Sequence, residues 1–335
     1  MSPPGTSILV RRGLWFALVG GVVTVGIALA TVQLDVPAAL AVLHRARPAW
    51  IVAAMALMTT GLVFLTARWR SLMPTDRPVP LLRLTGILTA GTLMHYAVPG
   101  PVGELVAAGM AADRFDVGVE QAFAAGIHAR FVGLALAGTI AALLFFVLDL
   151  HVPDGYRTAL GASAVAIGVG AVVLFVLSAR PDLLRRTGAL VFTQRVWPAR
   201  WSELGQSRVV QLADALAAVG HLGPRRYAEA AFWALAGHAA VIGGIEMTAL
   251  GLGAAPDPAG LVFTYAMTTA GAVVLFGVPG AQLGWDAMFT TLLVATAGLP
   301  LQIALGVVVV VRSQQLVVAV LGAIALIAAR PVRVQ

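Results

Sequence analysis

Apolar stretches of 18 residues or more recur along this chain of 335 residues. An α-helix of that length crosses the hydrocarbon core of a bilayer, which is about 30 Å thick. Only 11% of the residues are charged, whereas soluble domains have roughly 25%. The stretches take up nearly the whole chain and leave no room for a soluble catalytic domain. We therefore expect residues 1–335 to form a single all-α, polytopic integral membrane domain.

The composition also excludes several kinds of chemistry. The chain has no cysteine, which excludes disulfides, thiolate metal sites and cysteine nucleophiles. The sequence contains no metal-ligand spacing, phosphate-binding loop or Ser-His-Asp arrangement. No basic stretch has a pattern typical of nucleic-acid binding. We accordingly expect no enzymatic activity, no cofactor, no metal and no nucleic-acid partner.

A short segment occurs twice in the sequence. Residues 89–100 and 269–280 share the form Thr-Ala-Gly, six variable residues and Val-Pro-Gly, at a constant offset of 180. An acid follows each copy, Glu104 in the first half and Asp286 in the second. An arginine in the next apolar helix follows each acid by 26 residues. The sequence therefore predicts two repeats, at residues 81–148 and 259–329.

The arginines fix the expected topology through the excess of positive charge on the cytoplasmic side. If each Pro-Gly pair is the tip of a re-entrant hairpin, 17 arginines face the cytoplasm and three face outside. The cytoplasmic group includes Arg68 and both termini, and the expected location is the cytoplasmic (inner) membrane. Full crossings at the hairpins would instead give ten spans. Six spans are expected at residues 14–32, 50–67, 121–148, 158–178, 227–252 and 303–327, with hairpins at 84–112 and 260–299.

With this topology the first hairpin enters from the cytoplasm and the second from outside, so the repeats are inverted. Inverted repeats with broken helices at mid-membrane are typical of secondary transporters. Non-helical backbone at that depth is tolerated only beside protein or a water-filled cavity. The breaks therefore predict a midplane cavity. The candidate substrate-binding residues around the breaks are Pro99, Gly100, Gly103, Pro279, Gly280 and Gly284.

Arg130 and Arg312 lie inside long apolar stretches, where a charged residue costs roughly 2.5–3.5 kcal/mol on insertion scales. We expect Glu104 to be the counter-ion of Arg130, and Asp286 that of Arg312. One interpretation is a pair of structural salt bridges. The other is that each guanidinium binds the phosphate of an anionic substrate with two parallel hydrogen bonds. A further intramembrane acid, Glu246, follows His238 by eight residues, and these two are candidates for a proton relay.

Residues 180–226 form the one long hydrophilic connection and carry eight arginines. Ser202 is expected to begin a helix with one apolar stripe. A basic amphipathic helix beside tryptophans is typical of a membrane-surface segment. A cytoplasmic linker helix packed on the bundle is the equal alternative.

The residues around the Pro-Gly pairs, the acids and the helix arginines of the two halves resemble the flippase-like transmembrane region of lysylphosphatidylglycerol synthases and their stand-alone relatives. The first motif of that family is Pro-x-Arg-x-Gly-Glu-x-x-Arg, and here Pro101 and Ala107 occupy its arginine positions. Ala129 stands where an acid usually precedes the helix arginine. The resemblance implies lipid translocation without lysine addition. It is carried by Pro99, Gly103, Glu104 and Arg130, and by Pro279, Gly284, Asp286 and Arg312.

These observations predict a lipid transporter for an anionic phospholipid or a polyprenyl-phosphate-linked lipid, with the lipid headgroup as its partner. A proton-coupled carrier for a small soluble anion is one alternative. Another is a non-transporting partner of an envelope-biosynthesis enzyme that docks through residues 180–226. An integral-membrane transferase is the weakest alternative.

Overall fold

The structure is a computed structural model in which all regular secondary structure of the described residues is α-helical. The prediction of an all-α membrane fold is therefore confirmed at this level. The expected span at 14–32 lies outside the described residues. Those residues are 41–75, 77–97, 102–148, 150, 152, 154–192, 199–220, 222–275 and 281–328.

Within the described residues, five helices are long and apolar enough to cross a membrane: α3 (Pro48–Ser71), α6 (Val119–Val147), α7 (Asp154–Ala179), α10 (Gly223–Gly251) and α13 (Leu301–Ala328). Proline in the first turn of α3 and of α10 favours helix initiation because its missing N–H is not needed there.

Four shorter helices form two pairs in the places of the expected hairpins. They are α4 (Leu81–Ala97), α5 (Val102–Phe115), α11 (Pro258–Leu275) and α12 (Ala281–Ala295). The pairs have 17 and 14 residues in the first half, and 18 and 15 in the second. At 1.5 Å per residue, each of these helices is about 21–27 Å long, which is less than the hydrocarbon thickness.

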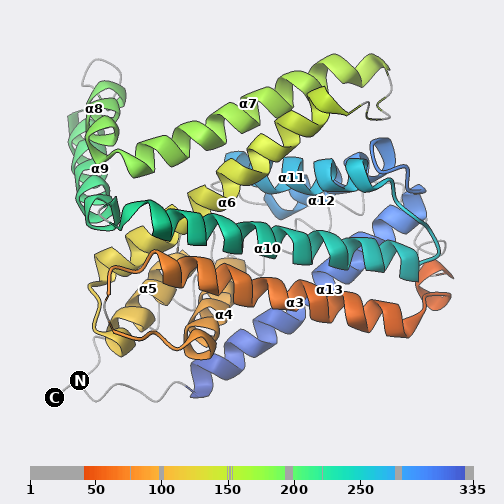
Figure 1. The fold of residues 1–335 in the computed structure, drawn as a ribbon, viewed down its shortest axis with the longest axis horizontal. Helices are drawn as coiled ribbons and strands as arrows, with labels where there is room; N and C mark the ends of the chain where they lie inside the picture. Colours follow the sequence, from red (N-terminus) through yellow and green to blue (C-terminus); the bar gives the residue numbers. More distant parts are fainter. Residues whose placement is uncertain are drawn as a thin grey trace.

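Helices α3 and α10 pack side by side along most of their length and run antiparallel (Figure 1). The Cβ position of Gly244 contacts Met58, near the middle of α3, whereas that of Gly251 at the end of α10 contacts Trp50 at the start of α3. Arg226 at the start of α10 donates a hydrogen bond to the carbonyl of Met73, just beyond α3 (3.2 Å). Small residues therefore let these two helices approach closely, as is common between membrane helices.

Two further contacts are reciprocal between the two halves. Helix α6 of the first half packs on α11 of the second, and α13 of the second half packs on α4 of the first. The Cβ position of Gly86 near the start of α4 contacts Ala325 near the end of α13, and Gly322 lies against the carbonyl of Thr89. Each arginine-bearing helix therefore packs on the shorter helix pair of the other half as well as on its own.

The basic connection folds into two helices, α8 (Pro181–Val191) and α9 (Ala199–Gly220), which lie across one end of the bundle (Figure 1). The expectation that Ser202 begins the helix is wrong, because α9 begins at Ala199. The hydroxyl of Ser202 donates instead to the carbonyl of Phe192, just after α8 (2.7 Å). Ser202 therefore ties the two helices together.

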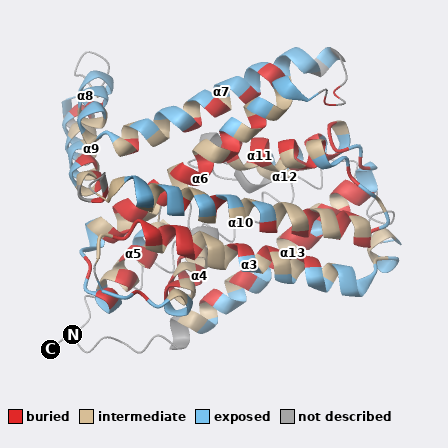
Figure 2. Cartoon of the chain, in the orientation of Figure 1, coloured by how far each residue is buried: buried red, intermediate tan, exposed pale blue. Residues whose placement is uncertain are grey.

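Exposed residues lie along the outer faces of the long helices (Figure 2), and many of them are apolar. Val169 of α7 is 57% exposed, Phe232 of α10 60% and Leu316 of α13 69%. Water-soluble proteins rarely expose contiguous apolar patches larger than a few hundred Å². The exposed side chains are therefore the lipid-facing surface of a multi-pass membrane protein.

Candidate functional site

The two intramembrane arginines occupy matching positions in the two halves. Arg130 is the twelfth residue of α6, counted from Val119, and Arg312 is the twelfth residue of α13, counted from Leu301. Each therefore lies about 17 Å from the start of its helix. Both helices are long and apolar enough overall to cross a membrane, so the charge is held well inside the span.

Arg312 forms the predicted ion pair with Asp286 of α12. Its Nη2 donates to Oδ1 at 2.7 Å, and its Nε lies 3.0 Å from Oδ1 and 3.1 Å from Oδ2. Nη1 donates to Oε1 of Gln315, one turn along the same helix (2.6 Å). The guanidinium also lies 5.3 Å from the ring centre of Trp285, a cation–π distance. These partners hold the planar guanidinium group of Arg312 in one orientation.

Arg130 forms the other predicted pair, with Glu104 of α5. Its Nη1 donates to Oε1 of Glu104. The second carboxylate oxygen, Oε2, is buried without a hydrogen-bond partner among the described residues. Among the described residues, Glu104 therefore accepts a hydrogen bond through one carboxylate oxygen, whereas Asp286 accepts through both.

Neither pair is sealed inside the protein. The side chains of Arg130 and Glu104 are 35% and 24% exposed, and those of Arg312 and Asp286 are 26% and 24% exposed. A guanidinium has five N–H donors in a planar arrangement, and phosphate oxygens match this arrangement as carboxylate oxygens do. Each pair is therefore chemically able to bind an anion while its carboxylate serves as the resting counter-ion.

The glycine and proline positions proposed from the sequence are only partly described. Pro99, Gly100, Pro279 and Gly280 lie outside the described residues. Gly103 is buried in α5 against α4, and Gly284 is exposed on α12.

His238 and Glu246 lie on α10, about 12 Å apart along the helix axis at 1.5 Å per residue. The His238 Nε2 lies 3.1 Å from the carbonyl oxygen of Gly133, and its Nδ1 lies 3.0 Å from the hydroxyl of Tyr265. Because a carbonyl only accepts, Nε2 carries the proton and the tyrosine hydroxyl donates to Nδ1. His238 thus joins α10 to α6 and α11, and the relay to Glu246 stays a prediction.

Arg68 is a residue that the sequence reasoning assigned wrongly to the cytoplasmic surface. It lies in the last turn of α3, but its side chain is inside the bundle and the residue is only 8% exposed. Its guanidinium fills the space that a Cβ at position 133 would occupy, at the middle of α6. Side chains on a helix lean towards its amino end, which carries this arginine back into the membrane. Its burial could not be predicted from the sequence, because an arginine near the end of a membrane helix usually extends to the membrane interface.

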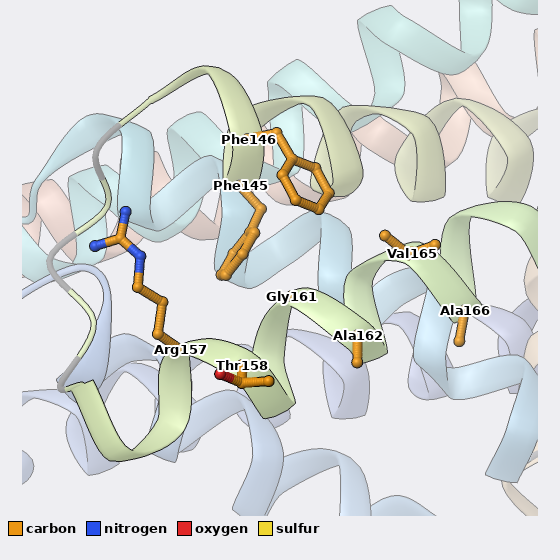
Figure 3. Close-up of a pocket in the computed structure, with 8 residues that line it drawn as sticks. All are labelled: Phe145, Phe146, Arg157, Thr158, Gly161, Ala162, Val165 and Ala166. Carbon is orange, nitrogen blue, oxygen red and sulfur yellow. The ribbon is translucent and has the colours of Figure 1, made fainter.

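An open pocket of about 750 Å³ lies where α6 ends and α7 begins. Figure 3 shows Phe145 and Phe146 facing the small side chains of α7, with Arg157 at one end. Phe145 is about 22 Å along α6 from Arg130, so the pocket is separate from the pair of Arg130 and Glu104.

Together, the fold and the paired charges define a multi-pass helical membrane protein with two matching acid–arginine pairs inside its bundle. The chain belongs to the family of the lysylphosphatidylglycerol synthase TM region, whose model matches residues 16–322. The family suggested by the sequence motifs is therefore confirmed, and membership of this family indicates a function related to membrane lipids. No curated protein and no solved structure matched the chain.

Proposed function

We propose that this protein transports a lipid across the membrane, and that its substrate is an anionic phospholipid or a polyprenyl-phosphate-linked lipid. The observation that carries the proposal is the duplicated pair of an arginine and a carboxylate at matching positions of α6 and α13. Ionisable groups inside a membrane bundle are costly and generally mark substrate or ion pathways. The location that goes with this function is the inner membrane, with both termini in the cytoplasm.

Re-entrant hairpins in inverted repeats would bring the two pairs to a shared depth. Three observations support this arrangement: the short lengths of α4, α5, α11 and α12, the antiparallel course of α3 and α10, and the reciprocal packing of each half on the other. In an inverted-repeat transporter the substrate site lies near the midplane, between the repeats. The guanidinium groups of Arg130 and Arg312 would then face the headgroup near the midplane, from two halves of opposite orientation.

The transport step would exchange one anionic partner for another. A phosphate that approaches Arg130 or Arg312 offers the guanidinium two oxygens in the same geometry as the carboxylate that it replaces. Glu104 or Asp286 would restore the pair when the headgroup leaves. Each arginine is therefore never without an anion, which keeps the barrier to headgroup passage low.

A reconstitution experiment tests this proposal. Purified protein in liposomes is assayed for the movement of a fluorescent phosphatidylglycerol between leaflets, with Arg130→Ala, Arg312→Ala and the exposed control Arg83→Ala. We expect both intramembrane variants to slow transport by at least tenfold, whereas the control does not. Wild-type rates in both variants would contradict the proposal.

The same liposomes separate the alternatives. Uptake of a soluble phosphate anion with no lipid movement would favour the small-anion carrier. Loss of envelope-enzyme activity in cells on deletion of residues 180–226, with both arginines dispensable, would favour the non-transporting partner.

A further inference from the structure

Arg68 is buried in the bundle without the counter-ion that the other two intramembrane arginines possess. No carboxylate of a described residue pairs with it, and its Nε has no hydrogen-bond partner among these residues. A second cation, Arg130, lies within electrostatic range of its guanidinium. A buried charge is normally paired, because removing it from water costs several kcal/mol. An unpaired, buried guanidinium therefore requires an explanation.

The surroundings of Arg68 hold its guanidinium in place but do not neutralise it. Trp69, the next residue, donates from Nε1 to the carbonyl of Ala122 and fixes the end of α3 against α6 (3.1 Å). Gly133 leaves the space into which the guanidinium reaches. His238 and Tyr265 are within electrostatic range of Arg68 and are hydrogen-bonded to each other, the pairing of a neutral imidazole with a neutral phenol. Among the described residues, Arg68, Arg130 and Glu104 then contribute two positive charges and one negative charge to this cluster.

The second half has no equivalent of this arginine. At the offset of 180 that relates Gly91 to Gly271, position 68 corresponds to Thr248. The hydroxyl of Thr248 donates to the carbonyl of Gly244 in its own helix (2.8 Å). The excess positive charge is therefore a property of the first half alone.

We propose that Arg68 is an anion-binding residue that, together with Arg130, binds the phosphate monoester or diester group of the transported substrate. This inference rests on the proposed function and deepens it. The bound phosphate supplies the negative charge that the cluster lacks, and its oxygens accept from the guanidinium of Arg68. The first half is then the stronger anion site of the two.

Binding measurements on the purified full-length protein in detergent test this inference. Dissociation constants are measured for dioctanoyl phosphatidylglycerol, dioctanoyl phosphatidylcholine and inorganic phosphate, and thermal unfolding is followed without ligand. Variants are Arg68→Met, Arg68→Lys and, as a control with the same charge change, the exposed Arg83→Met.

We expect Arg68→Met to weaken binding of the phosphatidylglycerol by about tenfold or more, as the loss of a charge-assisted hydrogen bond would. Without ligand this variant should unfold at the wild-type temperature or above it, because an unpaired buried charge has been removed. Arg83→Met should bind like the wild type. Unchanged binding of phosphatidylglycerol by Arg68→Met would overturn the inference. So would a wild-type protein that binds neither phosphatidylglycerol nor inorganic phosphate.

If Arg68→Met lowers both the unfolding temperature and the affinity, binding by Arg68→Lys distinguishes loss of the anion site from loss of structure. Partial recovery of binding by lysine supports the inference, and no recovery overturns it. Binding of inorganic phosphate but not of the lipid would support Arg68 as the anion-binding residue and contradict the proposed lipid substrate. Normal lipid movement in Arg130→Ala and Arg312→Ala liposomes would contradict the transport proposal alone, since the Arg68 measurement does not depend on transport.

Discussion

Gly91 of α4 lies directly against Gly103 of α5. A Cβ at position 91 would be 2.6 Å from the carbonyl oxygen of Gly103 and 2.8 Å from the Cβ of Ala107. Both neighbours are rigid parts of a helix, so the two helices would have to move apart to admit even a methyl group. Glycine at 91 thus sets the distance between α4 and α5.

We expect Gly91→Ala to destabilise the protein by about 1–3 kcal/mol through overpacking, despite the better helix propensity of alanine. Thermal unfolding in detergent measures this effect. The control is Gly109→Ala in α5, where a Cβ would meet nothing within 4 Å. That change should be neutral or stabilising by up to about 1 kcal/mol. Equal behaviour of the two variants would contradict the close packing.

The pair of Arg312 and Asp286 should behave as one energetic unit. We expect Arg312→Gln to cost about 2–3 kcal/mol, below the roughly 3–5 kcal/mol of a fully buried pair, because about a quarter of each side chain is exposed. Adding Asp286→Asn should recover part of that loss, since the uncompensated carboxylate is removed. A double-mutant cycle on unfolding free energies checks this, and strictly additive losses would argue against coupling.

Exchanging the two charges of the first pair separates its structural role from substrate binding. The double variant Glu104→Arg, Arg130→Glu keeps opposite charges in contact. If the guanidinium on α6 binds the headgroup, we expect near wild-type thermal stability but transport as slow as in Arg130→Ala. The liposome assay measures the rate. Full transport by the exchanged pair would show that only the salt bridge matters.

The contact between α8 and α9 depends on Arg185. Its Nη2 donates to Oδ1 of Asp214 on α9 (2.5 Å), and its Nη1 to Oδ1 of Asp182 on α8 (2.7 Å). The hydrogen bond to Asp214, with the nearby carboxylate charges, raises the pKa of Arg185 above its usual value. A raised pKa favours the charged form, so the stabilisation is complete at neutral pH and is lost only in strong alkali.

We therefore expect Asp214→Asn to increase amide hydrogen exchange in residues 181–220, and added salt to do the same in the wild type through screening. Asp182→Asn is the matched control, because it removes the same charge within one helix and leaves the contact between the helices. Identical exchange in both variants would contradict this role of Asp214.

The two charge pairs could be predicted from the sequence because the features that indicate them are local or occur in both halves. The spacing of 26 residues from Glu104 to Arg130 and from Asp286 to Arg312 recurs in both halves, and intramembrane charge needs a partner. The pairing of Arg185 with Asp214 and the position of Arg68 were not predictable in this way. Both depend on how helices from separate parts of the chain pack, and no periodicity in the sequence encodes that packing. The depth of a long side chain near a helix end likewise follows from its neighbours, here Gly133 and Trp69.

The cross-packing of α6 on α11 and of α13 on α4 has a mechanical consequence. A helix that tilts in one half displaces the short helices of the other half, so neither half moves as an independent rigid body. In the transport cycle that we propose, opening on one face of the membrane would therefore be linked to closing on the opposite face through the direct contact between Gly322 and Thr89.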